Sequence, residues 1–310
     1  MILKQLTVEN YEKFRAETKI NFNTTGITVF YGSSAASGAL LDAVNWTLYG
    51  KAETPPHERG ETLGRVILGY DGKEFILSRR TDGASESVHP VIFGLREDAV
   101  TEKDAADIVA KHHSPVWNSD EFVSLGFSSP HVSDVLREKL VFARLRDMSA
   151  EESEGLLAEA KTHVAPALEK QANQTITQFR FLCDDNDIAG WERFGAVKID
   201  EELSFTAENK DLTYSEKYLY SMLFFLAEIE TMRKIFSKNY CDFIMLKNFL
   251  DGVDSLYWPA AAYFLSRWRQ QAFITCTEAE AEKLRPLLPP ETVWYECRED
   301  GNVYGAKKMK

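Results

Sequence analysis

Residues Val29–Gly50 read VFYGSSAASGALLDAVNWTLYG and combine three features in one run. The β-branched and aromatic start is typical of a strand, the small residues after Gly32 indicate a turn, and Leu40–Tyr49 carries apolar residues at helical spacing. This order of strand, small-residue turn and helix is the pattern of a phosphate-binding loop, which holds the terminal phosphates with a lysine. Here no lysine or arginine occurs between Lys19 and Lys51. The run predicts the shape of a phosphate site without its cation.

The segments around this run are also predicted to be strands. Residues 2–8 and 19–31 are rich in β-branched and aromatic residues, and Asn23–Gly26 indicates a turn before the second apolar run. Residues 65–79 predict a hairpin, because Asp71-Gly72 is a favourable two-residue turn between alternating strands. The first part of the chain is therefore predicted to be strand-rich and to enclose one helix.

The middle of the chain changes to a helical pattern. Apolar residues within 133–182 are spaced for one face of a helix, and Ser149–Glu152 is a capping box that predicts the start of a second helix. Pro166 is expected to kink or restart that second helix, because proline has no N–H for the preceding turn. The polar, acidic stretch 183–195 is predicted to be a surface connection.

The last third returns to mixed structure. Residues 215–236 predict a long helix with a strongly apolar face. Residues 243–246 and 271–276 are short apolar runs that predict buried strands. Short apolar strands separated by helices indicate a mainly parallel sheet covered on both faces.

Composition limits the classes of function. The chain has 310 residues and a formal net charge of −12, which argues against a broad basic surface for nucleic acid. Its four cysteines have no metal-ligand spacing, so we expect reduced, partly buried thiols and no metal site. No run is long and apolar enough for a signal peptide or a membrane span, which predicts a cytoplasmic protein without membrane contact.

The N-terminal segments also resemble a known family. The start MILKQLTVENYEKF, the turn at Gly32 and the run LLDAVNWTLYGK are similar to the N-terminal lobe of the SMC-like ABC ATPases, the group of RecF, RecN, SbcC and DndD heads. The LYGK ending looks closest to DndD-like members, which are associated with DNA modification and phage defence. The resemblance implies an α/β fold of the P-loop NTPase class, an ABC-ATPase-like head with a mixed sheet, a strand-rich N-terminal lobe and a short helical arm.

The phosphate-loop positions of that family are degenerate here. Aligning from Gly32 places Gly38 at the lysine position and Ala39 at the hydroxyl position, whereas aligning backward from Leu40 places Ser37 and Gly38 there. Neither alignment supplies the lysine. The loop is also one residue shorter than the family pattern.

A second segment resembles the ABC signature, LSGGEK followed by a long apolar helix. The matching positions are Leu212, Thr213, Ser215, Glu216 and Lys217. Tyr214 replaces the first glycine, and its ring would crowd the surface that approaches a γ-phosphate across a dimer interface. The resemblance implies that these residues lie on the face where two heads meet.

The Walker B, switch and Q-loop positions have also changed. Residues 242–254 match the Walker B and D-loop frame, but Lys247 and Asn248 stand where the family has the Mg²⁺-holding aspartate and the water-activating glutamate. Residues 271–278 resemble the segment that ends in the switch histidine, yet the chain has no histidine after His163. Pro130 or His131 takes the place of the Q-loop glutamine.

The resemblance also implies a division of the chain. Residues 1–135 correspond to the N-terminal part of the head and residues 196–310 to its C-terminal part. Residues 136–195 stand where family members insert long coiled-coil arms, and the alternative for the helical part is an ordinary helical subdomain packed on the head. The two head parts are expected to form one compact body.

Together these departures predict a catalytically inactive SMC-like pseudo-ATPase with no catalytic residue, metal or cofactor. By resemblance, it would be a structural or regulatory subunit of a DNA-repair, chromosome-maintenance or anti-phage defence complex. Its partner would be a second copy or an active SMC-like ATPase, and DNA would be reached only through the complex. Two alternatives stay open: an atypical head that binds or hydrolyses ATP with Mg²⁺, its cation supplied by Lys247, and an unrelated enzyme with acidic residues among Asp242, Asp251 and Asp254.

Overall fold

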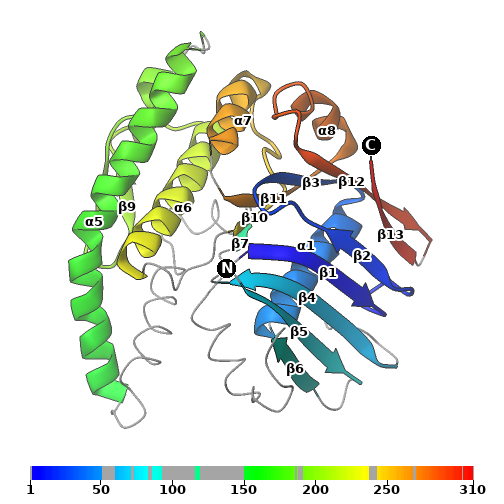
Figure 1. Cartoon of the computed structure of the whole chain (residues 1–310). Helices are drawn as coiled ribbons and strands as arrows, with labels where there is room; N and C mark the ends of the chain where they lie inside the picture. Colours follow the sequence, from blue (N-terminus) through cyan, green and yellow to red (C-terminus); the bar gives the residue numbers. More distant parts are fainter. Residues whose placement is uncertain are drawn as a thin grey trace. The chain divides into compact units, whose positions relative to one another are not determined.

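The structure is a computed structural model of the whole chain (Figure 1). It describes residues 2–50, 60–70, 73–82, 86–92, 116–118, 150–185, 187, 191–236, 243–267, 270–301 and 303–309. The chain divides into two compact units, each described below on its own. The first unit comprises Met1–Val116, Cys241–Phe249 and Ser266–Lys310, and the second comprises Trp117–Tyr240 and Leu250–Leu265.

The first unit contains an antiparallel sheet of five strands in the order β2-β1-β4-β5-β6. Its strands are β1 Ile2–Glu9, β2 Thr18–Asn21, β4 Thr62–Tyr70, β5 Lys73–Thr81 and β6 Glu86–Ile92. Two residues separate β4 from β5, as expected for the hairpin predicted at Asp71-Gly72. The register of β1 against β4 shifts between Leu3 and Gln5, a bulge that frees backbone groups of β1 from the ladder.

A second sheet has six strands in the order β13-β12-β3-β11-β10-β7. Its strands are β3 Gly26–Gly32, β7 Val116–Asn118, β10 Phe243–Lys247, β11 Gln271–Cys276, β12 Val293–Asp300 and β13 Val303–Lys308. β12, β3, β11 and β10 run parallel, and β13 is antiparallel to β12. β10 and β11 are buried along their whole length and are mostly apolar, as predicted for strands of a covered parallel sheet.

Helix α1 (Ser34–Tyr49) contacts strands of both sheets in the first unit. Its apolar residues join one large core with β1, β4, β3 and β12. Tyr11 closes this core at one point, donating its hydroxyl to the buried Asp42 carboxylate at 2.9 Å and packing its ring against Trp46. Helix α8 (Glu278–Leu284) contacts β3 and begins with a capping box at Thr277.

The second unit is mainly helical. It contains α5 (Ala150–Asp185), α6 (Tyr214–Phe236) and α7 (Trp258–Ser266, whose last residue belongs to the first unit), two short 3₁₀ turns, η2 (Trp191–Arg193) and η4 (Ser255–Tyr257), and the hairpin β8 (Val197–Ile199) and β9 (Phe205–Ala207). α5 packs against α6 and β8. The side chain of Asn173 on α5 bonds the N–H and the C=O of Val197, which ties the hairpin to the helix.

The helical predictions differ from the structure in two places. α1 begins at Ser34, six residues before the predicted start at Leu40. α5 continues through Pro166 as one helix and does not restart there. Residues 133–149, with the predicted capping box at Ser149, lie outside the described residues.

The division into units also bears on the predicted domains. α6 belongs to the same unit as α5, whereas the prediction places residues 196–310 with the N-terminal strands. The boundaries at residues 135 and 195 therefore stay predictions. No helix among the described residues has the length and apolar character of a membrane span.

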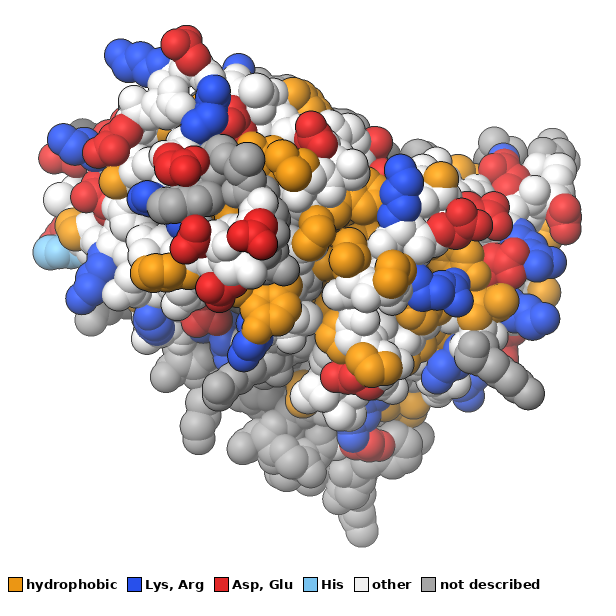
Figure 2. Space-filling model, turned by 90° about the horizontal axis from the view of Figure 1, so that it is seen from above, with side chains coloured by type: hydrophobic (Ala, Val, Ile, Leu, Met, Phe, Trp, Pro, Cys, Tyr) orange, Lys and Arg blue, Asp and Glu red, His pale blue; other side chains and the backbone are white. Residues whose placement is uncertain are grey.

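Surface side chains of the face in Figure 2 are mixed in kind. Lysine and arginine side chains alternate with acidic ones on that face, and hydrophobic side chains lie between them. This mixture agrees with the acidic composition, which argued against a broad basic surface.

Candidate functional site

The predicted phosphate loop begins at Gly32, the last residue of β3. Gly32 has φ +106°, and a Cβ atom there would lie 2.5 Å from the carbonyl oxygen of Cys297 on β12. The N–H of Ser33 donates to the same carbonyl at 2.9 Å. A glycine is required because β12 approaches the turn this closely and because φ is positive.

The next residues form the first turn of α1 and not a loop. Ser33 is the N-cap, and its hydroxyl accepts the N–H of Ala36 at 3.3 Å. The N–H of Ser37 donates to the carbonyl of Ser33 at 2.9 Å. The N–H groups of Ser33, Ala36 and Ser37 therefore all bond within the chain, whereas a phosphate loop directs such groups at its ligand.

This geometry corrects the prediction of a loop from Gly32 to Ala39. Ser37, Gly38 and Ala39 are helical, and the side chains of Ser37 and Ala39 are buried. The hydroxyl of Ser37 donates to the carbonyl of Ser34 at 3.2 Å. The physical reason is local: serine is a strong N-cap and alanine a strong helix former, so the sequence SSAAS starts the helix early.

The Walker B-like positions lie at the end of β10 in the same unit. Lys247 is its last residue and is only 7% exposed. Asn248 follows with φ +53°, and its N–H donates to the hydroxyl of Thr275 at 2.8 Å. The N–H of Phe249 donates to the carbonyl of Thr275, also at 2.8 Å. Thr275 on β11 therefore fixes the turn that carries Lys247 and Asn248.

The acidic residues Asp251 and Asp254 belong to the second unit. Among the residues that the structure describes, no group of three or more His, Cys, Asp or Glu side chains could hold a metal ion. Asp254 acts as the N-cap of η4, accepting the N–H of Leu256 at 3.0 Å. Asp242 lies outside the described residues. Asp254 therefore caps η4, and the acidic-site enzyme with Asp242, Asp251 and Asp254 stays an alternative.

The signature-like residues come together at the start of α6, in the second unit. Thr213 and Glu216 form a capping pair: the N–H of Thr213 donates to the Glu216 carboxylate at 2.7 Å, and the N–H of Glu216 donates to the Thr213 hydroxyl at 3.3 Å. Glu216 is buried and forms an ion pair with Arg193 at 2.6 Å. Arg193 also donates to the carbonyl of Asp211. Leu212, Thr213 and Glu216 are thus held in one fixed helix start.

The remaining signature positions contact the turn after residue 250. The hydroxyl of Ser215 accepts the N–H of Asp254 at 2.8 Å. Tyr214 is 47% exposed, and its ring lies against Gly252, where a Cβ atom would be 2.9 Å from the ring. Gly252 has φ +69°, so glycine is needed for both reasons. Tyr214 is therefore a half-exposed ring packed on the backbone of the turn at Gly252.

Several residues of these sites were not predicted from the sequence. They are Arg193, Thr275 and Cys297. The capping pair Thr213 and Glu216 carries a readable T-x-x-E signal, but the contacts of the other residues join positions far apart in the chain. The Q-loop positions Pro130 and His131 lie outside the described residues.

Three cysteines are buried free thiols, namely Cys183, Cys276 and Cys297. Burial raises the pKa of Cys183 and of Cys297 to about 12 and also raises the pKa of Cys276. These three cysteines are therefore buried free thiols, as the sequence predicts, with the protonated form favoured by burial.

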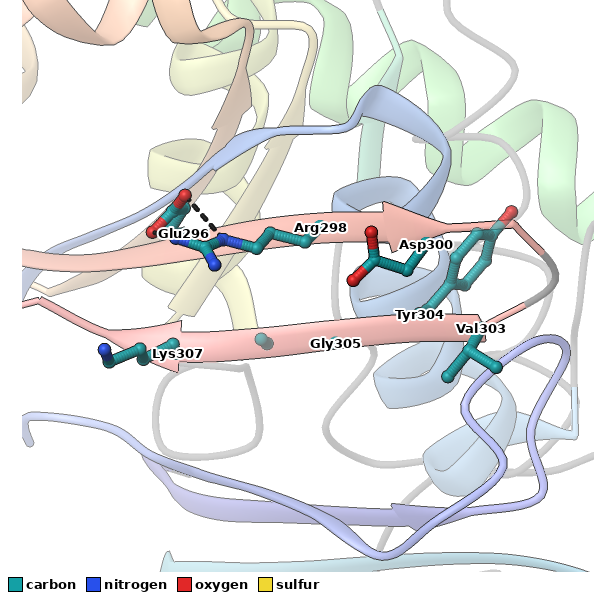
Figure 3. Close-up of a pocket in the computed structure, with 8 residues that line it drawn as sticks. Glu296, Arg298, Asp300, Val303, Tyr304, Gly305 and Lys307 are labelled. Carbon is teal, nitrogen blue, oxygen red and sulfur yellow. Dashed lines mark hydrogen bonds and ion pairs between the residues drawn. The ribbon is translucent and has the colours of Figure 1, made fainter.

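Two hollows among the described residues lie elsewhere. Figure 3 shows one of about 250 Å³ on the hairpin β12–β13, with α1 behind it. Glu296 and Arg298 point toward each other there and form an ion pair, while Gly305 leaves the neighbouring strand without a side chain. Another, of about 510 Å³, lies between α5 and β8. Neither is lined by the predicted nucleotide positions Gly32, Ser37, Gly38, Ala39, Lys247 and Asn248.

Comparison with known proteins supports the fold. No family model and no curated protein matches the chain. Among solved structures, the SMC head domain from Thermotoga maritima matches with a TM-score of 0.58 and 14% identity over 100% of both chains. An SMC head bound to the C-terminal winged-helix domain of ScpA matches with a TM-score of 0.63 and 12% identity over 100% of this chain and 98% of that one. At such identities the likeness concerns the fold alone, and it confirms the predicted fold class.

Proposed function

We propose that this chain, which has the fold of an SMC-like ABC ATPase head, is a catalytically inactive head that acts as a structural or regulatory subunit. One observation carries this proposal: α1 begins directly after Ser33, and the N–H groups of Ser33, Ala36 and Ser37 all bond within the chain. The loop has no lysine, and three of its N–H groups are already bonded within the chain, so the features that hold a triphosphate are largely lost.

The end of β10 supports the same conclusion. Magnesium is bound by oxygen ligands, usually carboxylates, and Lys247 and Asn248 provide a cation and an amide at the family's carboxylate positions. Phosphoryl transfer depends on metal and charge stabilisation and on a group that orients the attacking water. The chain offers none of these at the matching positions.

We expect no ATP binding by the purified chain. Isothermal titration calorimetry with ATP, in the presence and in the absence of Mg²⁺, should give only the heat of dilution. Saturable binding that requires Mg²⁺ would favour the alternative of an atypical nucleotide-binding head. The variant Lys247→Ala then tests whether Lys247 supplies the cation that holds the nucleotide. Loss of ATP affinity in this variant would show that it does.

The retained role would be association with a second SMC-like head, either another copy or an active partner. The start of α6 is rigid, because Thr213 and Glu216 cap each other and Arg193 neutralises the buried Glu216. Tyr214 is the exposed aromatic residue on it. Partly exposed aromatic residues on rigid supports are common anchors of protein interfaces. Participation in DNA repair, chromosome maintenance or phage defence is implied by the family resemblance.

We predict that Tyr214→Ala weakens this association without unfolding the protein. Truncating a central interface tyrosine costs about 2 kcal/mol, or roughly thirtyfold in Kd. Sedimentation velocity of the wild type and the variant, alone and with a candidate partner head, measures the change. The association should not depend on added ATP.

Phe181→Ala is the matched control, since Phe181 is a large side chain that is 65% exposed on α5, outside the signature-like segment. It should associate as the wild type does. Equal weakening by both variants, or a wild type that stays monomeric with every partner head, would rule out this interface.

A further inference from the structure

The N-terminus of α1 is in contact with a carboxylate of the same chain. The hydroxyl of Ser33, the N-cap, lies 3.4 Å from a carboxylate oxygen of Glu299 on β12. The same hydroxyl accepts the N–H of Ala36. It therefore connects the Glu299 carboxylate to the first turn of the helix, where an anion is stabilised by the helix dipole.

A lysine holds this carboxylate from the other side. The Lys13 ammonium forms an ion pair with Glu299 and lies 5.1 Å from the centre of the Tyr304 ring. The turn that carries Lys13 is attached to β13, because the N–H of Tyr304 donates to the carbonyl of Lys13 at 2.9 Å. The backbone of Lys13 is therefore held against β13, in addition to the contacts of its side chain.

The pKa shifts of Lys13 and Glu299 agree with this geometry. The hydrogen bond from Lys13, with a smaller contribution from the Ser33 hydroxyl, lowers the pKa of Glu299. The hydrogen bond to Glu299 raises the pKa of Lys13. Glu299 is therefore an anion and Lys13 a cation at neutral pH, with the charge of each favoured by the other.

We propose that Glu299 is an internal anion that occupies the N-terminal end of α1 and the Lys13 ammonium in place of a phosphate group. A cation, a hydroxyl and a helix N-terminus converge on one carboxylate, which is the set of groups that would otherwise bind an external anion. The chain itself supplies the anion. The proposal goes beyond the inactive-head proposal, because it assigns a residue that keeps phosphate groups out.

The test removes the charge of Glu299 while keeping its shape. Glu299→Gln should bind inorganic tripolyphosphate about tenfold more tightly than the wild type in calorimetry at low salt, because one negative charge beside the site is gone. The gain should disappear in Glu299→Gln combined with Lys13→Ala. It should also disappear in about 1 M NaCl, which screens the interaction.

Glu296→Gln is the matched control. It removes one negative charge from the same strand, but Glu296 is paired with Arg298 on the other face of β12 (Figure 3). It should bind tripolyphosphate as the wild type does. An equal gain in Glu296→Gln, or no gain in Glu299→Gln, would overturn the proposal.

A measurement on the wild type avoids dependence on the folding of the variants. The acetylation rate of Lys13, followed by mass spectrometry, should not change when tripolyphosphate is added, because Glu299 already occupies Lys13. Protection of Lys13 by tripolyphosphate would show that the site is open and would overturn the proposal. These measurements contain no ATP and no Mg²⁺, so their outcome is independent of the test of catalytic inactivity.

Discussion

Gly64→Ala is expected to lower the free energy of unfolding by about 3 kcal/mol, at the upper end of the usual cost of overpacking. A Cβ atom on Gly64 of β4 would lie 2.1 Å from the Thr47 hydroxyl and 2.8 Å from the ring of Trp46, both on α1. Trp46 is fully buried, and the Thr47 hydroxyl already donates to the carbonyl of Ala43. Neither side chain has room to move away, so β4 would have to separate from the helix. Urea unfolding followed by circular dichroism measures the effect.

Gly38→Ala in α1 is the matched control. Nothing lies within 4 Å of a Cβ atom at Gly38, and the residue is inside the helix. Alanine should therefore raise the stability by about 0.5 to 1 kcal/mol. The control also tests the early helix start, because Gly38 lies inside a helix only if α1 begins before Leu40. Destabilisation by Gly38→Ala, or a neutral Gly64→Ala, would contradict the structure of this region.

Gln271→Leu is expected to cost about 3 kcal/mol, because it leaves buried backbone groups without partners. Gln271 opens β11 and is 1% exposed. Its side chain accepts the N–H of Leu3 at 2.8 Å and donates to the carbonyl of Leu3 at 2.6 Å and to the carbonyl of Asn23. Leu3 lies directly before the bulge in β1, and its backbone N–H and C=O both bond the Gln271 side chain.

The same substitution on β1 provides the comparison. Gln5 donates to the side chain of Asn21 in an exposed hydrogen bond, so Gln5→Leu should change the stability by less than about 0.5 kcal/mol. Thermal and urea unfolding of the two variants give the difference. If Gln271→Leu unfolds at the same urea concentration as Gln5→Leu, then Gln271 does not join the two sheets as described.

The sequence predicted the fold where the pattern is local. Periodicity and turn residues predict three elements that the structure contains. They are the strand that ends at Gly32, the hairpin around Asp71-Gly72 and the long helix from residue 215. The exception is the segment after Gly32. The N-cap character of Ser33 and the alanines after it favour a helix, whereas the phosphate-loop pattern predicts a turn over the same residues. The predicted helix therefore starts six residues later than α1 does.

The candidate site was only partly predictable, because its contacts are distant in sequence. Lys13 and Glu299 are separated by 286 positions. Ser33 follows β3 and contacts Cys297 on β12, and no local pattern gives the order that makes these strands neighbours. The sequence shows Tyr214 in place of the first glycine of the ABC signature. That its ring lies on Gly252 follows only from the folded turn, in which φ is positive at Leu250 and Gly252.

The absence of a working nucleotide site is tested most directly by phosphate release from ATP. The purified chain, with Mg²⁺ and ATP, should release phosphate at the rate of buffer alone, and Lys247→Ala should give the same rate. Turnover by the wild type that requires Mg²⁺ and disappears in Lys247→Ala would contradict the inactive-head proposal and identify Lys247 as the cation of an active site.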